Sequence, residues 1–135
     1  MPRLAVVATR MAFLQLGFGA TLGAIILTTK AMGIWPTSWA WLPAHIESLV
    51  IGWLVQLAFG VAFWILPRIG GQRPQAGFAW LAIVSLNLGV LLSGLSPLLL
   101  AAPWPVLAGR MLSVIGVAAF ALHAWPRVKV AGLPG

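Results

Sequence analysis

Cysteine is absent from this chain of 135 residues, and acidic residues nearly so, since one Asp or Glu stands against eight Lys and Arg. Without cysteine there can be no disulfide, no thiolate metal site and no CxxCH haem attachment. Charged residues make up 7% of the chain and hydrophobic residues 61%, whereas about 25% of an average soluble domain is charged. This composition cannot cover a water-facing surface, and it excludes a soluble domain. Disorder is excluded too, because disordered chains are poor in hydrophobic residues.

Long apolar runs are what the chain does contain. About 20 residues of helix cross a bilayer, and four runs approach that length, at about 11–29, 44–66, 77–100 and 106–125. A transmembrane barrel is disfavoured because its strands would alternate apolar and polar residues. We therefore predict a single transmembrane domain over residues 1–135, an all-α four-helix bundle in up-down-up-down order within the lipid bilayer. The first run is long for a signal peptide.

The predicted connections differ in polarity. Residues 33–43 contain the three tryptophans Trp35, Trp39 and Trp41. Because tryptophan concentrates at membrane interfaces, we expect this connection to lie along one membrane surface. Pro43 suits the first turn of the next helix, where its missing N–H costs nothing. Residues 68–75 are the most polar stretch and predict a turn in water, and residues 102–105 predict another turn.

The basic residues predict the orientation. With four spans, the side that holds both termini carries Arg3, Arg10, Arg68, Arg73, Arg127 and Lys129, and the opposite side carries Lys30 and Arg110. The positive-inside rule then places both termini in the cytoplasm, most simply of a bacterial inner membrane. The net charge of +7 thus indicates orientation rather than nucleic-acid binding.

The only acid, Glu47, stands about one turn inside the outer end of the second span. Arg110 stands at a similar depth in the fourth span. An unpaired charge in hydrocarbon is costly, so a structural Glu47–Arg110 ion pair is one prediction. The alternatives are a proton-handling carboxyl at Glu47 and an anion or haem-propionate contact at Arg110.

One stripe of the second span has steps of seven, four and four residues, which keep its members on one helical face. It consists of His45, Gly52, Gln56 and Gly60. A ring-shaped cofactor could lie on such a small-residue face, with His45 as metal ligand. Tight helix packing uses the same glycines, and Gln56, with Asn87 and Gln15, could equally form hydrogen bonds between helices.

The two histidines of the chain lie near opposite faces of the predicted bundle. His45 and His123 are separated by about the ~30 Å hydrocarbon thickness, so they cannot bind one haem within one chain. A second ligand beside His45 would be Met32, Met111 or a residue of a neighbouring subunit. His123 is predicted to be an interfacial histidine.

Residues 45–68 resemble a stretch of the catalytic subunit of haem-copper oxidases, especially the nitric-oxide-reductase and cbb3-type branches. The matching residues are His45, Gly52, Trp53, Gln56, Gly60, Pro67 and Arg68. The resemblance implies that His45 is an axial ligand of haem b, with Gly52 and Gly60 flooring the porphyrin. It covers about a fifth of the chain, and the catalytic subunit has about twelve spans and more histidines. The resemblance therefore implies a small relative of that fold's N-terminal part.

Three functions follow as expectations. The first is an accessory subunit of a respiratory or photosynthetic electron-transfer complex, possessing one haem b or none, and not an enzyme on its own. The second is a structural or assembly subunit without cofactor, whose partners are other membrane subunits or copies of itself. A small transporter or channel component is the third, disfavoured because pores and carriers carry several ionisable groups or broken helices.

Overall fold

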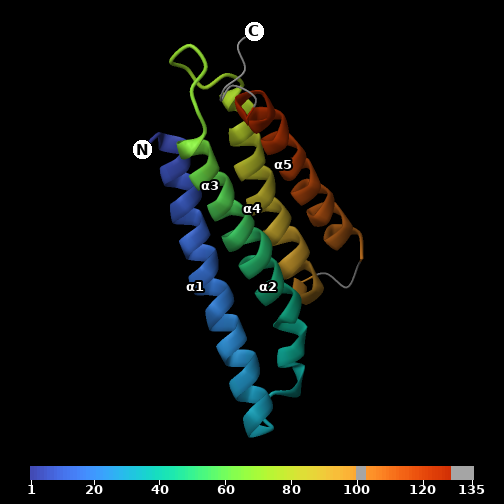
Figure 1. Ribbon diagram of the computed structural model, residues 1–135. Coiled ribbons are helices and arrows are strands. Elements are labelled where there is room, and N and C mark those ends of the chain that lie inside the picture. The colour runs from blue at the N-terminus through green and yellow to red at the C-terminus, as the bar shows by residue number, and fades with distance from the viewer. Residues whose placement is uncertain (100–102, 129–135) are drawn as a thin grey trace.

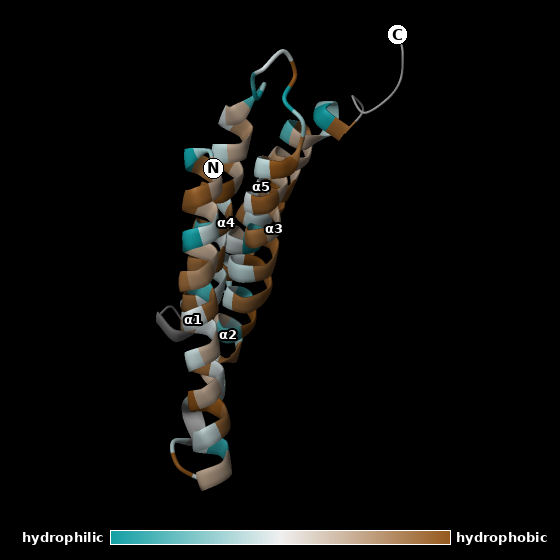
Figure 2. Ribbon diagram, turned by 60° about the vertical axis from the view of Figure 1, so that its left-hand side comes forward, coloured by the Kyte–Doolittle hydropathy of each residue, from teal (hydrophilic) through white to brown (hydrophobic). Residues whose placement is uncertain are grey.

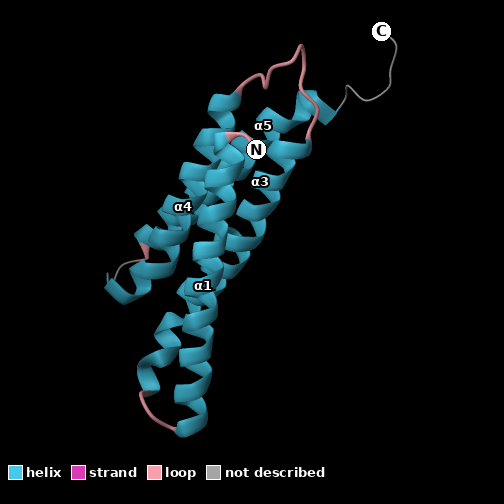
Figure 3. Cartoon of the chain, turned by 90° about the vertical axis from the view of Figure 1, so that its left-hand side faces the viewer, coloured by secondary structure: helices cyan, strands magenta, loops and turns pink. Residues whose placement is uncertain are grey.

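The computed structural model describes residues 1–99 and 103–128. Every regular element in this part of the chain is helical (Figure 1 and Figure 3). In chain order the elements are α1 (Arg3–Met32), η1 (Pro36–Trp41), α2 (Leu42–Glu47), η2 (Ser48–Val55), α3 (Gln56–Ile65), α4 (Ala76–Leu99) and α5 (Trp104–Val128). Four helices, with η1 to α3 as one continuous rod, are long and apolar enough to cross a membrane. This confirms the all-α bundle of apolar helices.

The bundle has two distinct ends. Figure 1 shows the N-terminus, the loop between α3 and α4 and the last turn of α5 at one end, which we call the terminal end. The turn between α1 and η1 lies at the opposite end, which we call the hairpin end, and there α1 and the start of the rod project beyond α4 and α5. Figure 2 shows apolar residues along every helix. The predicted end of the third span at Leu100 and the basic residue Lys129 lie outside the described residues.

Helix α1 starts eight residues before its predicted start at residue 11, because its first turns are part of the core. Leu4, Ala5 and Ala8 are buried against α3 and α4 in one apolar cluster. The helix ends at Gly33, whose φ of 65° reverses the chain and lets its N–H bond to the Lys30 carbonyl. Glycine adopts this left-handed conformation without strain.

The predicted loop at residues 33–43 is largely wrong. Only residues 33–35 form a turn, because Pro36 begins the 3-10 helix η1. Proline suits such a start since its fixed φ is already helical. Pro43 lies in the first turn of α2, as predicted. At the other end of the chain, α5 continues through Pro126 to Val128, three residues beyond the predicted end at 125.

Two helix pairs make up the bundle. Helix α1 packs along α2, η2 and α3, while α4 packs most extensively with α5. Small residues let α4 and α5 approach closely: a Cβ at Gly109 would lie 2.7 Å from the Gly89 carbonyl oxygen. The two pairs meet through α2 against α4 and through the core cluster at the terminal end. Because α1 and α4 make little contact, a cleft remains between them.

Candidate functional site

His45 lies at the hairpin end, in the last turn of α2, with its ring against Gly23 of α1. Its Nδ1 is 2.8 Å from the Gly19 carbonyl oxygen. A carbonyl oxygen only accepts hydrogen bonds, so Nδ1 carries the proton and, in the neutral ring, Nε2 keeps its lone pair. A histidine that donates from Nδ1 to a backbone carbonyl is oriented as metal-ligating histidines are.

The ring borders an open groove, called here the His45 groove, with a volume of about 440 Å³. Its lining comes from α1, η1 and α2 and consists of Ala20, Gly23, Ile26, Leu27, Lys30, Trp39, Leu42 and His45. The Lys30 ammonium stands 4.9 Å from the centre of the Trp39 ring, a cation–π contact. The groove thus combines apolar walls, one imidazole and one cation.

Helix α1 packs directly against Gly52, Gln56 and Gly60 of the rod, which we call the glycine stripe. A Cβ at Gly52 would lie 2.8 Å from Gln15 Cδ, and one at Gly60 would lie 3.1 Å from Ala8 Cβ. Between them, the Gln56 side chain is completely buried and donates from Nε2 to the Ala8 carbonyl oxygen at 3.2 Å. The predicted porphyrin floor of Gly52 and Gly60 does not fit this structure, because α1 already covers that face, and Gln56 is likewise used in packing against α1.

Gln56 also takes part in the predicted hydrogen bonding between helices. Asn87 Nδ2 of α4 donates to Gln56 Oε1 at 2.8 Å and to the Ile83 carbonyl oxygen at 2.8 Å. The two amides therefore connect α1, α3 and α4 in the interior of the bundle. Gln15 makes no such bond within the described residues.

Glu47 and Arg110 come together as the sequence suggested. Arg110 Nε lies 3.7 Å from Glu47 Oε1, with side-chain exposures of 69% and 15% respectively. Glu47 follows His45 by two residues and thus projects from the other side of the same helix, toward α5 rather than toward α1. Arg110 is consequently not part of the His45 groove, and its predicted role at a haem propionate has no support in this geometry.

The two methionines considered as second ligands are both exposed and stand apart from His45. Met32 is 65% exposed at the end of α1, and Met111 is 54% exposed on α5. Neither lines the His45 groove. Within the described residues there is also no group of three or more His, Cys, Asp and Glu side chains that could hold a metal ion.

A second cluster of polar side chains, at the terminal end, was not predicted. The Arg127 side chain is completely buried and donates to three carbonyl oxygens at the end of α3. These are Phe63 at 3.3 Å, Leu66 at 2.6 Å and Pro67 at 2.9 Å. Such a cation satisfies the free carbonyls of a helix C-terminus and complements the helix dipole. We call this group, with His123, the arginine clamp.

His123 completes the clamp. Its Nε2 accepts from Arg127 Nη1 at 2.7 Å, and its Nδ1 donates to the Gln75 carbonyl oxygen at 3.2 Å. Its ring stacks on Phe63 with 5.1 Å between centres. Both ring nitrogens are therefore used. His123 is a buried structural residue near the terminal end, where the sequence placed it, and it packs inside the bundle rather than on its surface.

Comparison of the chain with protein-family models, curated proteins and solved structures gave no match. The resemblance to haem-copper oxidases therefore stays a prediction from residues 45–68.

One signal in the sequence pointed to the clamp. His123 and Arg127 are spaced i, i+4, which puts them on the same face of a helix, and Arg127 follows a proline. The face itself was unknown, because the partner carbonyls belong to α3, about sixty residues earlier in the chain.

Proposed function

We propose that this protein is an accessory membrane subunit of an electron-transfer complex related to haem-copper oxidases, in which His45 binds the iron of one haem b. The observation that supports it is the state of the His45 ring. Its Nδ1 donates to the Gly19 carbonyl oxygen, which fixes the ring and directs the lone pair of Nε2 away from that bond. His123 uses both ring nitrogens in hydrogen bonds, whereas Nε2 of His45 makes none among the described residues.

The residues of the His45 groove fit this group in part. Gly23 and Ala20 are small and leave space on one side of the groove, and Lys30 provides a cation for a propionate. The apolar contacts would come from Ile26, Leu27 and Leu42. Haem bound there would supply a one-electron carrier. Among the described residues that line the groove there is no second histidine and no methionine, so any further ligand would come from another subunit. An open groove with one ligand suits a subunit better than a self-sufficient cytochrome.

The orientation belongs to the same proposal. The terminal end carries Arg3, Arg68 and Arg73, and we infer that it faces the cytoplasm. The His45 groove then lies near the opposite membrane surface. The absence of cysteine makes this easy to test, since single-cysteine variants Gln72→Cys and Trp39→Cys would each carry the only thiol. A membrane-impermeant maleimide added to intact cells should label the cysteine at 39 and spare the one at 72.

An absorption spectrum tests haem binding. The protein, produced in haem-replete cells and purified in detergent, should show a Soret band that His45→Ala removes. Met111→Ala is the matched control, because Met111 lies outside the groove, and it should keep the band. A colourless wild-type protein would overturn haem binding, and loss of the band in Met111→Ala alone would move the site to α5.

A structural or assembly subunit without cofactor is the second candidate. It is favoured by the glycine stripe, which is filled by Gln15, Ala8 and Thr9 of α1 as in an ordinary packing interface. This function predicts co-purification with larger membrane subunits in both wild type and His45→Ala. Isolation of the chain as a free monomer from gently solubilised membranes would contradict it.

A further inference from the structure

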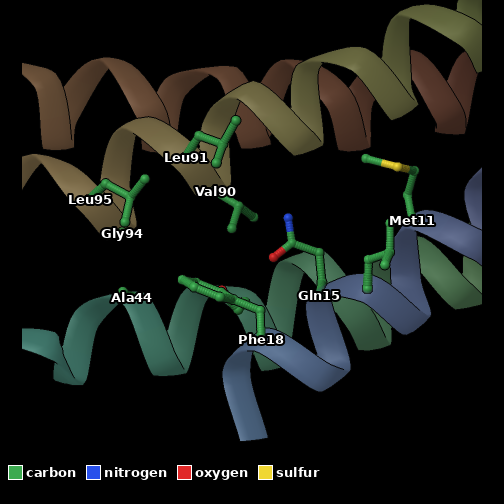
Figure 4. Close-up of a pocket in the computed structure, with 10 residues that line it drawn as sticks. Met11, Gln15, Phe18, Ala44, Val90, Leu91, Gly94 and Leu95 are labelled. Atoms are coloured by element: carbon green, nitrogen blue, oxygen red, sulfur yellow. The ribbon is translucent and has the colours of Figure 1, made fainter. Parts of the chain in front are cut away.

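A cleft between α1 and α4 contains the side-chain amide of Gln15, which has no hydrogen-bond partner among the described residues. The cleft, about 290 Å³ in volume, is lined by Met11, Leu14, Gln15, Phe18, Ala44, Ser48, Val90, Leu91, Gly94 and Leu95. Figure 4 shows the Gln15 amide extending from α1 into the space between the helices, toward Val90 of α4. We call it the Gln15 cleft. It lies apart from the His45 groove, and the two share no lining residue.

The Gln15 side chain is held in this direction by its surroundings. Its Cβ, Cγ and Cδ atoms all lie within 3.0 Å of where a Cβ at Gly52 would stand, so they rest directly on the backbone of η2. The amide beyond them takes part in no hydrogen bond among the described residues. Gln56 uses both its amide nitrogen and its amide oxygen, and Asn87 uses its nitrogen, whereas Asn87 Oδ1 is buried without a partner among the described residues. An unbonded amide in hydrocarbon is costly, so a ligand in this cleft would gain a hydrogen bond that the protein leaves open.

The position of Gln15 narrows the class of ligand. It stands near the middle of α1 (Arg3–Met32), far from the ester and headgroup oxygens that lipids keep at the membrane surface. An acyl chain at this depth would leave the amide unbonded. What fits is an apolar molecule that carries a carbonyl or hydroxyl on its ring and dissolves in hydrocarbon. Phe18 offers an aromatic face for a flat ring, and Leu14, Leu91 and Leu95 offer contact for a hydrocarbon tail.

We propose that the Gln15 cleft binds a membrane quinone, with a ring carbonyl accepting a hydrogen bond from the Gln15 amide. In the reduced quinol, the ring hydroxyl would instead donate to Gln15 Oε1, so one amide serves both forms. The site is independent of haem at His45. A colourless protein that binds quinone would retain this proposal and lose the other.

Direct binding of decyl-ubiquinone to the detergent-purified full chain tests the proposal. We expect saturable binding that Gln15→Leu weakens about five- to tenfold, the effect of one lost hydrogen bond. Because Gln15 supports no other residue by hydrogen bonding, the variant should fold normally. Infrared spectra add a second readout: a bound carbonyl stretch shifted to lower frequency in wild type and unshifted in Gln15→Leu.

A filled cleft is the second test. Leu91→Trp puts a larger side chain into the lining and should abolish binding, whereas Leu88→Trp, on the same helix with a similar exposure of 47% against 49%, should bind as wild type does. The proposal is overturned if wild type shows no saturation, if both Gln15→Leu and Leu91→Trp bind normally, or if lauric acid, which has a tail without a ring, displaces the quinone at equal concentration.

Discussion

A histidine and an arginine at each end of the bundle are used in opposite ways. At the terminal end, His123 and Arg127 are completely buried and the guanidinium and both ring nitrogens are bonded within the chain. At the hairpin end, His45 uses one nitrogen and Arg110 is 69% exposed. Side chains whose hydrogen bonds are all made within the chain stabilise the fold. Side chains with an unused donor or acceptor can bind a ligand or a partner. The position of a residue type, rather than its chemistry alone, decides between structure and function here.

Arginine substitution should give the largest contrast between the ends. Arg127→Met keeps the bulk but removes the hydrogen-bond donor of the Leu66 and Pro67 carbonyl oxygens and of His123, while the Phe63 carbonyl oxygen keeps its bond from Arg73 Nε. Hydrogen bonds to charged groups are each worth about 1.5–3 kcal/mol. We expect the free energy of unfolding, from SDS titration in mixed micelles, to fall by about 3 kcal/mol or more. Arg110→Met should change it by less than about 1 kcal/mol because the Arg110 side chain is 69% exposed and ion pairs of exposed side chains contribute little. Equal losses of stability in the two variants would contradict the difference between the two ends.

Histidine substitution should give the next largest contrast. His123→Ala removes a buried ring stacked on Phe63 and leaves Arg127 without one partner, so the free energy of unfolding should drop by about 2–3 kcal/mol. His45→Ala removes one hydrogen bond at a groove and should cost about 1 kcal/mol. Thermal unfolding followed by circular dichroism would rank the two variants. A His45→Ala protein less stable than His123→Ala would make the hairpin end the structural one.

The interior amides Gln56 and Gln15 test how far along the bundle, from the terminal end, polar side chains are bonded within the chain. Gln56→Leu breaks the bonds to the Ala8 carbonyl and to Asn87, and such bonds within membranes average about 0.6 kcal/mol with a maximum of about 1.7. We expect a loss of about 1 kcal/mol in the same SDS titration. Gln15→Leu is the control, because its amide bonds to none of the described residues, and it should leave stability unchanged or raise it, since an unbonded amide in hydrocarbon is costly. Equal losses would mean that Gln15 is structural and would weaken the case for a ligand in its cleft.

The sequence was enough to predict the four helices because apolar run length is a local property. It was also enough for Glu47 and Arg110, since both helices enter from one side and depth can be counted from their ends. Neither prediction required knowledge of which helix faces pack together. The role of the glycine stripe did require that knowledge, because the spacing of Gly52, Gln56 and Gly60 suits a flat cofactor and a neighbouring helix equally. Only the packing of α1 on this face distinguishes the two roles.

The arginine clamp could not be predicted for a related reason. Counted as a charge near a membrane surface, Arg127 belonged with Arg3 and Arg68 in the orientation argument. Its actual role depends on the carbonyls at the end of α3, which no local pattern connects to α5. The open nitrogen of His45 is likewise a tertiary property, since Gly19 of α1 provides the acceptor.

Gly23→Ala should have the smallest effect on stability, and it is the most specific test of His45 at the hairpin end. A Cβ at Gly23 would lie 2.5 Å from His45 Cε1, whereas Gly17, on the same helix, has nothing within 4 Å. Gly23→Ala therefore displaces the imidazole from its bond to Gly19, but the ring can swing into the groove. The gain in helix propensity, about 1 kcal/mol for alanine over glycine, should nearly offset the lost contact.

Gly17→Ala provides the matched control, with the same gain in propensity and an undisturbed histidine. We expect both variants to unfold within about 1 kcal/mol of wild type, while only Gly23→Ala shifts the His45 ring signals in NMR spectra of the histidine-labelled protein. His123 signals should stay in place in both variants, since the clamp lies at the other end. If Gly23→Ala moves the signals of both histidines, the two ends are coupled, and the separation between a closed structural end and an open binding end fails.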